Sequence, residues 1–152
     1  MKVKAAAPWD PESAHSFWIN HASRLLMREF EQRLRPLGFG MAYLPVVGAL
    51  DESGPLLQKE LAERAHVEQP TMAALLARME RDGWILRAPH PSDRRATQVA
   101  LTARAKAMWP EAQELLTQVA ERVTDGFNER EKATFLALLR RAVKNLSEAS
   151  DE

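Results

Sequence analysis

The chain has 152 residues, of which 45% are hydrophobic, and its 21 lysines and arginines are balanced by 21 aspartates and glutamates. These values suit a globular protein of one domain or one domain with an appendage, and they exclude a bulk positive charge as the basis for binding nucleic acid, so such binding requires a local cluster. The absence of cysteine excludes disulfides, thiolate metal ligands and thiol redox sensing.

The first third of the chain predicts a short arm and two helices. Two prolines in the first dozen residues predict the arm, and Ser13 is a candidate cap for a long helix over residues 13–36. Hydrophobic residues recur along that helix at helical spacing: Trp18, Ala22, Leu26, Phe30, Leu34 and Leu37. A second helix over about 41–51 tolerates Pro45 only in its first turn. No apolar stretch is long enough for a signal peptide or a membrane span, so we expect a cytoplasmic protein with no membrane partner.

The segment LLQKELAERAHVEQPTMAALLARMERDGW predicts two short helices joined by a tight turn. Residues 66–68 interrupt the helical pattern, Pro70 suits the first turn of the second helix, and Gly83 ends it. The apolar face of the second helix consists of Met72, Leu75, Leu76 and Met79. Two short helices around a tight turn are typical of a helix-turn-helix, although an ordinary helical hairpin has the same pattern.

A short charged finger follows this motif and is flanked by two strand candidates, residues 84–87 and 97–101. Its base is apolar and its tip is charged: Ile85, Val99 and Leu101 against Asp93, Arg94 and Arg95. A helix-turn-helix followed directly by a two-stranded hairpin is the order of a winged helix. The base is therefore expected to pack on the core, while the tip meets solvent or a ligand.

The last third predicts two more helices. Thr102 is a candidate cap for a helix to about residue 125, in which Pro110 predicts a kink or a break. Asn128 and Glu131 have the spacing of a capping box for a last helix to about residue 147, before an acidic tail.

The predicted fold is mainly α with a small two- or three-stranded β wing: a winged helix-turn-helix with long terminal dimerisation helices. We expect an arm and a dimerisation helix over residues 1–38, the DNA-binding winged unit over 39–101, and C-terminal dimerisation helices over 102–152. The central part is too small to cover three long apolar stripes, so we expect a homodimer; a monomeric helical bundle is the alternative.

Residues 56–109 resemble the core of the MarR family of bacterial transcriptional regulators. The resemblance lies in QKELAERA for the first motif helix, LLARMERDGWILR for the end of the recognition helix and the strand after it, and SDRRATQVALT for the wing. It continues more loosely through the first helix and LPVVGAL. It implies a homodimer that binds a near-palindromic operator in double-stranded DNA, commonly as a repressor, and leaves it when a small, often phenolic, effector binds.

The helix over residues 69–82 is then expected to enter the major groove by its N-terminal part. Its candidate DNA contacts are Gln69, Thr71, Ala73, Ala74 and Arg78. Glutamine bonds adenine edges, threonine bonds a base or a phosphate, and alanine methyls touch thymine methyls. Many family members have a Thr-Arg pair where this chain has Ala73 and Ala74, which predicts weaker polar readout. Lys59 and Arg64 on the first motif helix are candidate backbone contacts, with solvated surface as the alternative.

The wing arginines suit a narrow A·T-rich minor groove, whose enhanced negative potential attracts arginine. The resemblance makes Arg95 the foremost DNA contact and Arg94 the second. Asp93 faces phosphates unfavourably, so we expect it to pair with an arginine and fix the shape of the hairpin. The alternative to DNA contact by these arginines is a surface salt-bridge cluster that stabilises the turn by no more than about 1 kcal/mol.

An effector site is expected where the terminal helices meet the winged unit. Its candidate lining residues are Trp18, His21, Tyr43, Met108 and Trp109, for each of which core or interface packing is the alternative. No cofactor or metal is expected. No nucleophile motif, glycine-rich phosphate loop or His-carboxylate cluster appears, so we expect no enzyme. The competing function is a winged helix that has become a protein-interaction module, an idea that Ala73 and Ala74 keep open.

Overall fold

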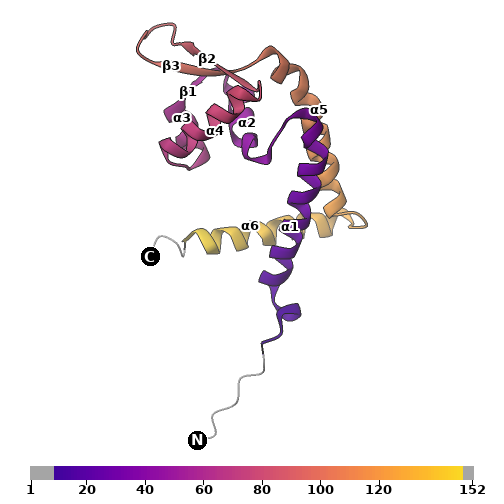
Figure 1. Ribbon diagram of the computed structural model, residues 1–152. Coiled ribbons are helices and arrows are strands. Elements are labelled where there is room, and N and C mark those ends of the chain that lie inside the picture. The colour runs from indigo at the N-terminus through magenta and orange to yellow at the C-terminus, as the bar shows by residue number, and fades with distance from the viewer. Residues whose placement is uncertain (1–8, 149–152) are drawn as a thin grey trace, which may run out of the picture. The chain divides into compact units, whose positions relative to one another are not determined.

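The computed structural model describes residues 9–148, in which helices dominate and one small antiparallel sheet occurs (Figure 1). The chain divides into two compact units, Met1–Leu116 and Thr117–Glu152. The described elements are α1 (His15–Leu34), α2 (Leu44–Ser53), β1 (Leu56–Leu57), α3 (Gln58–Ala65), α4 (Gln69–Arg81), β2 (Ile85–Pro89), β3 (Thr97–Leu101), α5 (Ala103–Val123) and α6 (Glu129–Glu148). This order confirms the predicted winged helix-turn-helix with long terminal helices. Most of the predicted arm and the last four residues of the tail lie outside the described residues.

The start of α1 differs from the prediction. Ser13 does not cap the helix, because Pro11–Ser13 forms a separate 3₁₀ turn whose cap is Asp10; the Asp10 carboxylate accepts a hydrogen bond from the Glu12 backbone N–H at 3.1 Å. A proline prefers the first turn of a helix, which places the start of helical structure at Pro11. The α1 helix then begins after Ala14 without a side-chain cap.

Prolines and left-handed residues set the bounds of α2, α3 and α4. As predicted, Pro45 and Pro70 lie in the first turns of α2 and α4, where a missing backbone N–H costs no helical bond. The α2 helix runs two residues further than expected, to Ser53, and ends at Gly54, whose φ of 74° favours glycine. The break between α3 and α4 is at His66, which has a left-handed φ of 54°.

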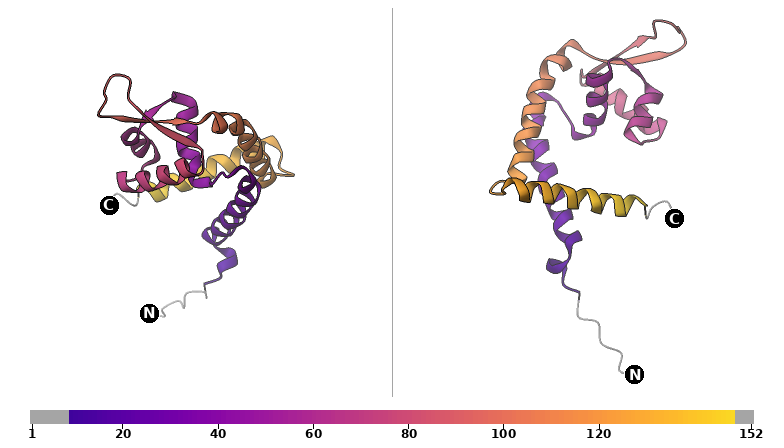
Figure 2. Two further views of the ribbon diagram at one scale, coloured as in Figure 1. Left: turned by 45° about the horizontal axis from the view of Figure 1, so that its top comes forward. Right: turned by 180° about the vertical axis from the view of Figure 1, so that it is seen from behind.

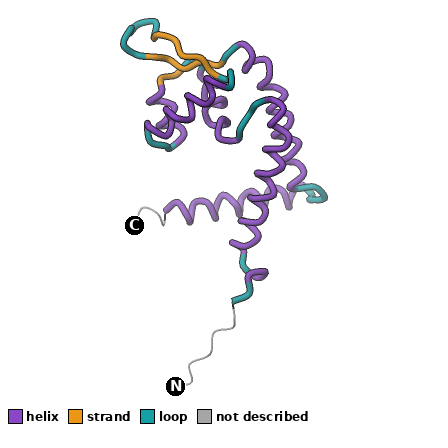
Figure 3. The backbone as a smooth tube through the Cα atoms, in the orientation of Figure 1, coloured by secondary structure: helices purple, strands orange, loops and turns teal. Residues whose placement is uncertain are grey.

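The three strands form an antiparallel sheet in the order β1-β3-β2. The hairpin pairs Ile85 with Leu101 and Arg87 with Val99. Ile85, Val99 and Leu101 are all buried, which confirms the apolar base of the wing. The loop between β2 and β3 projects beyond the helices, as Figures 2 and 3 show.

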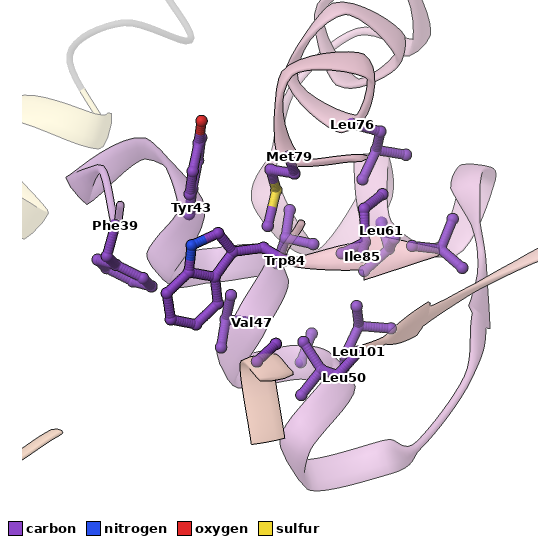
Figure 4. Close-up of a cluster of buried hydrophobic side chains, with 14 of the residues drawn as sticks. Phe39, Tyr43, Val47, Leu50, Leu61, Leu76, Met79, Trp84, Ile85 and Leu101 are labelled. Atoms are coloured by element: carbon purple, nitrogen blue, oxygen red, sulfur yellow. The ribbon is translucent and has the colours of Figure 1, made fainter. Parts of the chain in front are cut away.

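The core of the first unit is built around aromatic rings and aliphatic residues from α2, α3, α4 and the sheet (Figure 4). The Phe39 ring meets the Trp84 ring edge-on, with 4.9 Å between centroids, and the Trp84 indole N–H donates to the Gly38 carbonyl at 2.9 Å. Both Trp84 and Met79 are almost completely buried. The end of α4 is therefore fixed against the segment that joins α1 to α2.

The last two helices follow the capping predictions. Thr102 accepts a hydrogen bond from the Ala105 backbone N–H at 3.0 Å at the start of α5. The sequence predicted a kink or a break at Pro110; the break does not occur, because α5 continues as one helix through this residue. Asn128 and Glu131 each accept a hydrogen bond from the other's backbone N–H, both at 2.9 Å, as a capping box requires. Within residues 9–148, no helix has the length and apolarity needed to cross a membrane.

Candidate nucleic-acid interface

The α4 helix has one face in the core and one in solvent. Met72, Leu76 and Met79 have no exposed surface and hold the helix on the core. The N-terminal face of α4 comprises Gln69, Thr71 and Ala74, which are exposed, and Ala73, which is half-buried. The core does not cover these four residues, and their contact with DNA stays a prediction.

The cationic residues of α4 lie towards its other end and contact neighbouring side chains. The Arg78 guanidinium lies 5.8 Å from the centre of the Tyr43 ring. Arg81 pairs with Asp82 at 3.3 Å, and Glu80 with Arg87 of β2 at 2.9 Å. Arg78 is exposed, so its guanidinium remains accessible to a phosphate at the edge of the interface.

A group of polar contacts anchors the α4–β2 turn (residues 82–84). The Tyr43 hydroxyl donates to the Asp82 carboxylate at 2.5 Å, Arg104 donates to the Asp82 carbonyl at 2.8 Å, and the Thr102 hydroxyl donates to the Gly83 carbonyl at 2.6 Å. These bonds tie the end of α4 to the start of α2 and the start of α5. They therefore fix the orientation in which α4 presents its N-terminal face.

The Tyr43–Asp82 contact also shifts the acidity of both groups. Burial raises the pKa of the Tyr43 hydroxyl, and the hydrogen bond to the Asp82 carboxylate raises it further. The same hydrogen bond lowers the pKa of Asp82. The two shifts have the same physical origin, because the bond requires a protonated tyrosine and an ionised aspartate.

The tip of the wing is shaped by bonds between side chains and backbone. The Asp93 carboxylate accepts from the Arg95 backbone N–H at 3.0 Å, and the His90 ring nitrogen Nδ1 accepts from the Ser92 N–H at 3.1 Å. The predicted pairing of Asp93 with an arginine side chain is thus replaced by a bond to the backbone two residues on, which aspartate forms readily in turns. Arg94 and Arg95 are exposed at the tip.

The two candidate DNA contacts on α3 differ in how their side chains are bonded. Lys59 is well exposed and lies 3.9 Å from Glu63, whereas Arg64 donates to the Ser53 hydroxyl at 2.8 Å, at the end of α2. Sequence reasoning missed Gln58, whose amide nitrogen lies 3.4 Å from the Gln69 amide oxygen. This contact joins the first turn of α3 to the first turn of α4.

The five effector candidates comprise two aromatic pairs and Met108. Tyr43 and Trp109 pack around Phe39 in the core, at 6.0 and 5.9 Å between ring centroids, and the Trp109 indole donates to Asp51 at 2.9 Å. Trp18 and His21 lie together on α1, with ring centroids 6.4 Å apart. Met108 is half-buried on α5. Within residues 9–148, no group of three His, Asp or Glu side chains is arranged to hold a metal ion.

A hollow of about 650 Å³ opens beside the N-terminal face of α4. Most of its wall is apolar, and it is lined by Ala42, Pro45, Ala65, Val67, Pro70, Thr71, Met72, Ala74, Leu75 and Arg78. The hollow shares Thr71 and Ala74 with the N-terminal face and also includes the exposed Arg78. A molecule bound there contacts residues that also face outward from α4.

Comparison with known proteins identifies the family. The MarR family model matches residues 46–97. A curated relative from Bacillus subtilis, the uncharacterised HTH-type transcriptional regulator YwoH, is 30% identical over 122 residues, which cover 80% of this chain and 88% of the relative.

Solved structures share the fold. A mutant MarR from Escherichia coli complexed with operator DNA superposes with a TM-score of 0.71 at 24% identity, over 82% of this chain and 90% of that one. The transcriptional repressor CouR, bound to a 23-mer DNA duplex, gives a TM-score of 0.74 at 23% identity, over 87% and 94% of the two chains. The chain belongs to the MarR family of DNA-binding transcriptional regulators.

Proposed function

We propose that the protein is a homodimeric repressor that binds a near-palindromic operator through α4 in the major groove and the wing in the adjacent minor groove. The observation that carries the proposal is the wing tip. Arg94 and Arg95 are exposed there, and the Asp93 and His90 bonds to the backbone fix the hairpin that presents them. A fixed hairpin reduces the entropy lost when an arginine enters a groove.

The terminal helices support a dimer. Apolar side chains are exposed on α1 and α6, and two of the most exposed are Val143 at 63% and Leu146 at 73%. The others on these helices are Phe17, Trp18, Ile19, Leu25, Met27, Leu136 and Leu138. Apolar surface on this scale marks an interaction site, and a second copy of the chain covers it with the symmetry that a palindromic operator needs. A single chain has one α4, whereas two operator half-sites need two.

Bound to the operator, the protein represses transcription, and a small effector relieves the repression. The CouR structure is of a transcriptional repressor bound to DNA, which supports repression by occupancy of an operator. The apolar hollow beside α4 suits a small aromatic effector with an anionic group that Arg78 binds. Because the hollow shares Thr71 and Ala74 with the N-terminal face of α4, an effector there competes with DNA.

The experiment is a fluorescence-anisotropy titration of the DNA upstream of the protein's own gene, with the dimer checked by light scattering. Arg95→Ala is expected to weaken binding at least tenfold. It is also expected to reduce the slope of the log of the affinity against the log of the salt concentration by about one. Arg130→Ala removes the same charge from α6, an element that the proposal does not place on DNA, and is the matched control. Equal losses for the two variants contradict a specific role of the wing.

The competing function is a winged helix that binds another protein. The alanines on the N-terminal face of α4 favour it, since they lack the polar groups that usually bond base edges. Sequence-selective, salt-dependent binding to any genomic fragment excludes it. A dimer that binds no fragment selectively supports it over the repressor.

A further inference from the structure

The N-terminal part of α4 presents methyl groups rather than cations outside its core face. Between Gln69 and Ala77 the helix carries three alanines and one threonine outside its core face, and no lysine or arginine. Thr71, Ala74 and Ala77 are exposed, and Ala73 is half-buried. Residues three apart lie on one side of a helix, so the methyl groups of Thr71 and Ala74 adjoin near its N-terminus, with Ala73 beside them. Ala77 lies about one turn further along, away from the N-terminal part.

The cations of α4 are poorly placed to replace this readout. Arginine bonded to guanine is the commonest specific base contact in the major groove. Here Arg78 lies against the Tyr43 ring, and Arg81 pairs with Asp82 at the far end of the helix. The N-terminal part of a recognition helix is the part that meets base edges, so both cations are placed nearer to phosphates.

The polar side chain that remains at the start of α4 matches adenine. The Gln58 amide nitrogen donates to the Gln69 amide oxygen across 3.4 Å, which orients the Gln69 amide and leaves its nitrogen free to donate outward. A glutamine amide recognises the N6 and N7 edge of adenine by donating one bond and accepting another. The Gln69 oxygen retains a second lone pair for the adenine amino group.

We propose that α4 selects A·T base pairs, with the methyl groups of Thr71, Ala73 and Ala74 on thymine methyls and Gln69 on adenine, in place of guanine contacts by cations. The inference rests on the proposed function, because it requires α4 to enter a major groove. Recognition of the thymine methyl has a specific consequence. Deoxyuridine pairs as thymine does and presents the same hydrogen-bonding groups, but it lacks the methyl group that these side chains contact.

The test begins with the full-length dimer and a duplex pool with a randomised centre, from which the protein selects its own sites. The expected half-site is rich in A·T pairs. Each contacted thymine is then replaced by deoxyuridine, and the dissociation constant is measured at fixed salt. Loss of one buried methyl is expected to weaken binding about fourfold, equivalent to ~0.8 kcal/mol, while deoxyuridine outside the half-sites has no effect.

A variant pair assigns the effect to the helix. Ala74→Gly removes a methyl group from the N-terminal face, and Ala77→Gly places the same helix-weakening residue one turn further along. At one contacted position, Ala74→Gly is expected to bind the thymine and the deoxyuridine duplex with equal affinity. Ala77→Gly is expected to keep the wild-type preference for thymine at every contacted position. Circular dichroism checks that both variants fold.

Two further outcomes separate this inference from the proposed function. A selected site that depends on Arg95, is unaffected by deoxyuridine and is lost with 7-deazaguanine leaves the repressor proposal intact and overturns the methyl readout. A dimer that selects no sequence from the pool overturns both.

Discussion

Replacing Tyr43 by phenylalanine isolates one bond in the anchor of the α4–β2 turn. The Tyr43 side chain is 3% exposed, so phenylalanine fills the same space and removes only the hydroxyl that donates to Asp82 at 2.5 Å. A hydrogen bond to a charged group contributes about 1.5–3 kcal/mol. The Asp82 side chain is 33% exposed, so water replaces part of the lost bond, and we expect Tyr43→Phe to lower the unfolding free energy by about 1 kcal/mol.

The pH dependence of this difference follows from the two pKa shifts. The pKa of Asp82 is lowered from 3.8 in the folded protein, so its contribution to stability is present above that value and is lost as the pH falls through the folded pKa. The pKa of Tyr43 is raised from 10.0, so its contribution is present below that value and is lost as the pH rises through the folded pKa. The difference between wild type and variant is therefore constant from about pH 5 to 9 and shrinks on both sides.

The tryptophans and the single tyrosine of the chain allow both measurements to be made by spectroscopy. Urea unfolding followed by tryptophan fluorescence, at one protein concentration for all variants, gives the difference in unfolding free energy. Tyr43 is the one tyrosine in the sequence, so the absorbance of tyrosinate during an alkaline titration reports on this hydroxyl alone. The titration midpoint is expected above 10.0 in the folded protein and near that value in urea.

A double-variant cycle with Asp82→Asn supplies the control, because it isolates the energy of the Tyr43–Asp82 bond from the other effects of each substitution. We expect a coupling of about 1 kcal/mol. A coupling below ~0.3 kcal/mol, together with the same tyrosine midpoint with and without urea, refutes the role assigned to this pair.

Three further predictions test local features of the fold and the wing. Gly83→Ala places a side chain at a φ of 79°, with its Cβ 3.0 Å from the Arg104 guanidinium, and is expected to lower the unfolding free energy by about 1–2 kcal/mol. Its control in the same urea assay is Gly48→Ala inside α2, where the new methyl group meets open space and the change is expected to be neutral or stabilising. Asn128→Ala removes the α6 cap and is expected to cost about 1 kcal/mol, measured by thermal unfolding, unless Glu131 alone holds the helix end. Asp93→Ala is expected to weaken DNA binding several-fold in anisotropy titrations while the melting temperature stays unchanged; an equal affinity contradicts a shaping role for this turn.

The helices and the wing follow from the sequence because their signals are local. Hydrophobic periodicity located α4 and its buried face, and alternation between polar and apolar residues located β3. The order of a helix-turn-helix and a hairpin then determined the fold. The predicted N-terminus of α1 was wrong because Pro11 starts a separate 3₁₀ turn over Pro11–Ser13, which includes the predicted cap Ser13, and α1 begins only after Ala14.

The anchor of α4 carries no such local signal. Tyr43 and Asp82 are 39 residues apart, Trp84 and Gly38 are 46 apart, and Trp109 and Asp51 are 58 apart. Pairing between single polar groups at these separations depends on how the helices pack, which a periodic pattern does not encode. Tyr43 and Trp109 drew notice in the sequence as effector-site candidates, and the structure gives each a hydrogen-bonding partner from a distant segment.

The two ends of α4 have different physical tasks, and this division bears on how specificity can change in this chain. Backbone carbonyls at residues 82 and 83 accept bonds from Arg104 and Thr102, so the C-terminal end is fixed by groups outside the N-terminal face. The N-terminal face consists of small side chains that contribute little to the core. On the proposed mode of binding, substitutions at Ala73 or Ala74 are therefore expected to alter base preference at little cost in stability, whereas substitutions in the anchor are expected to tilt the helix and weaken binding to all sequences together. The ratio of affinities for two operators, measured beside the unfolding free energy, distinguishes these effects in any variant of α4.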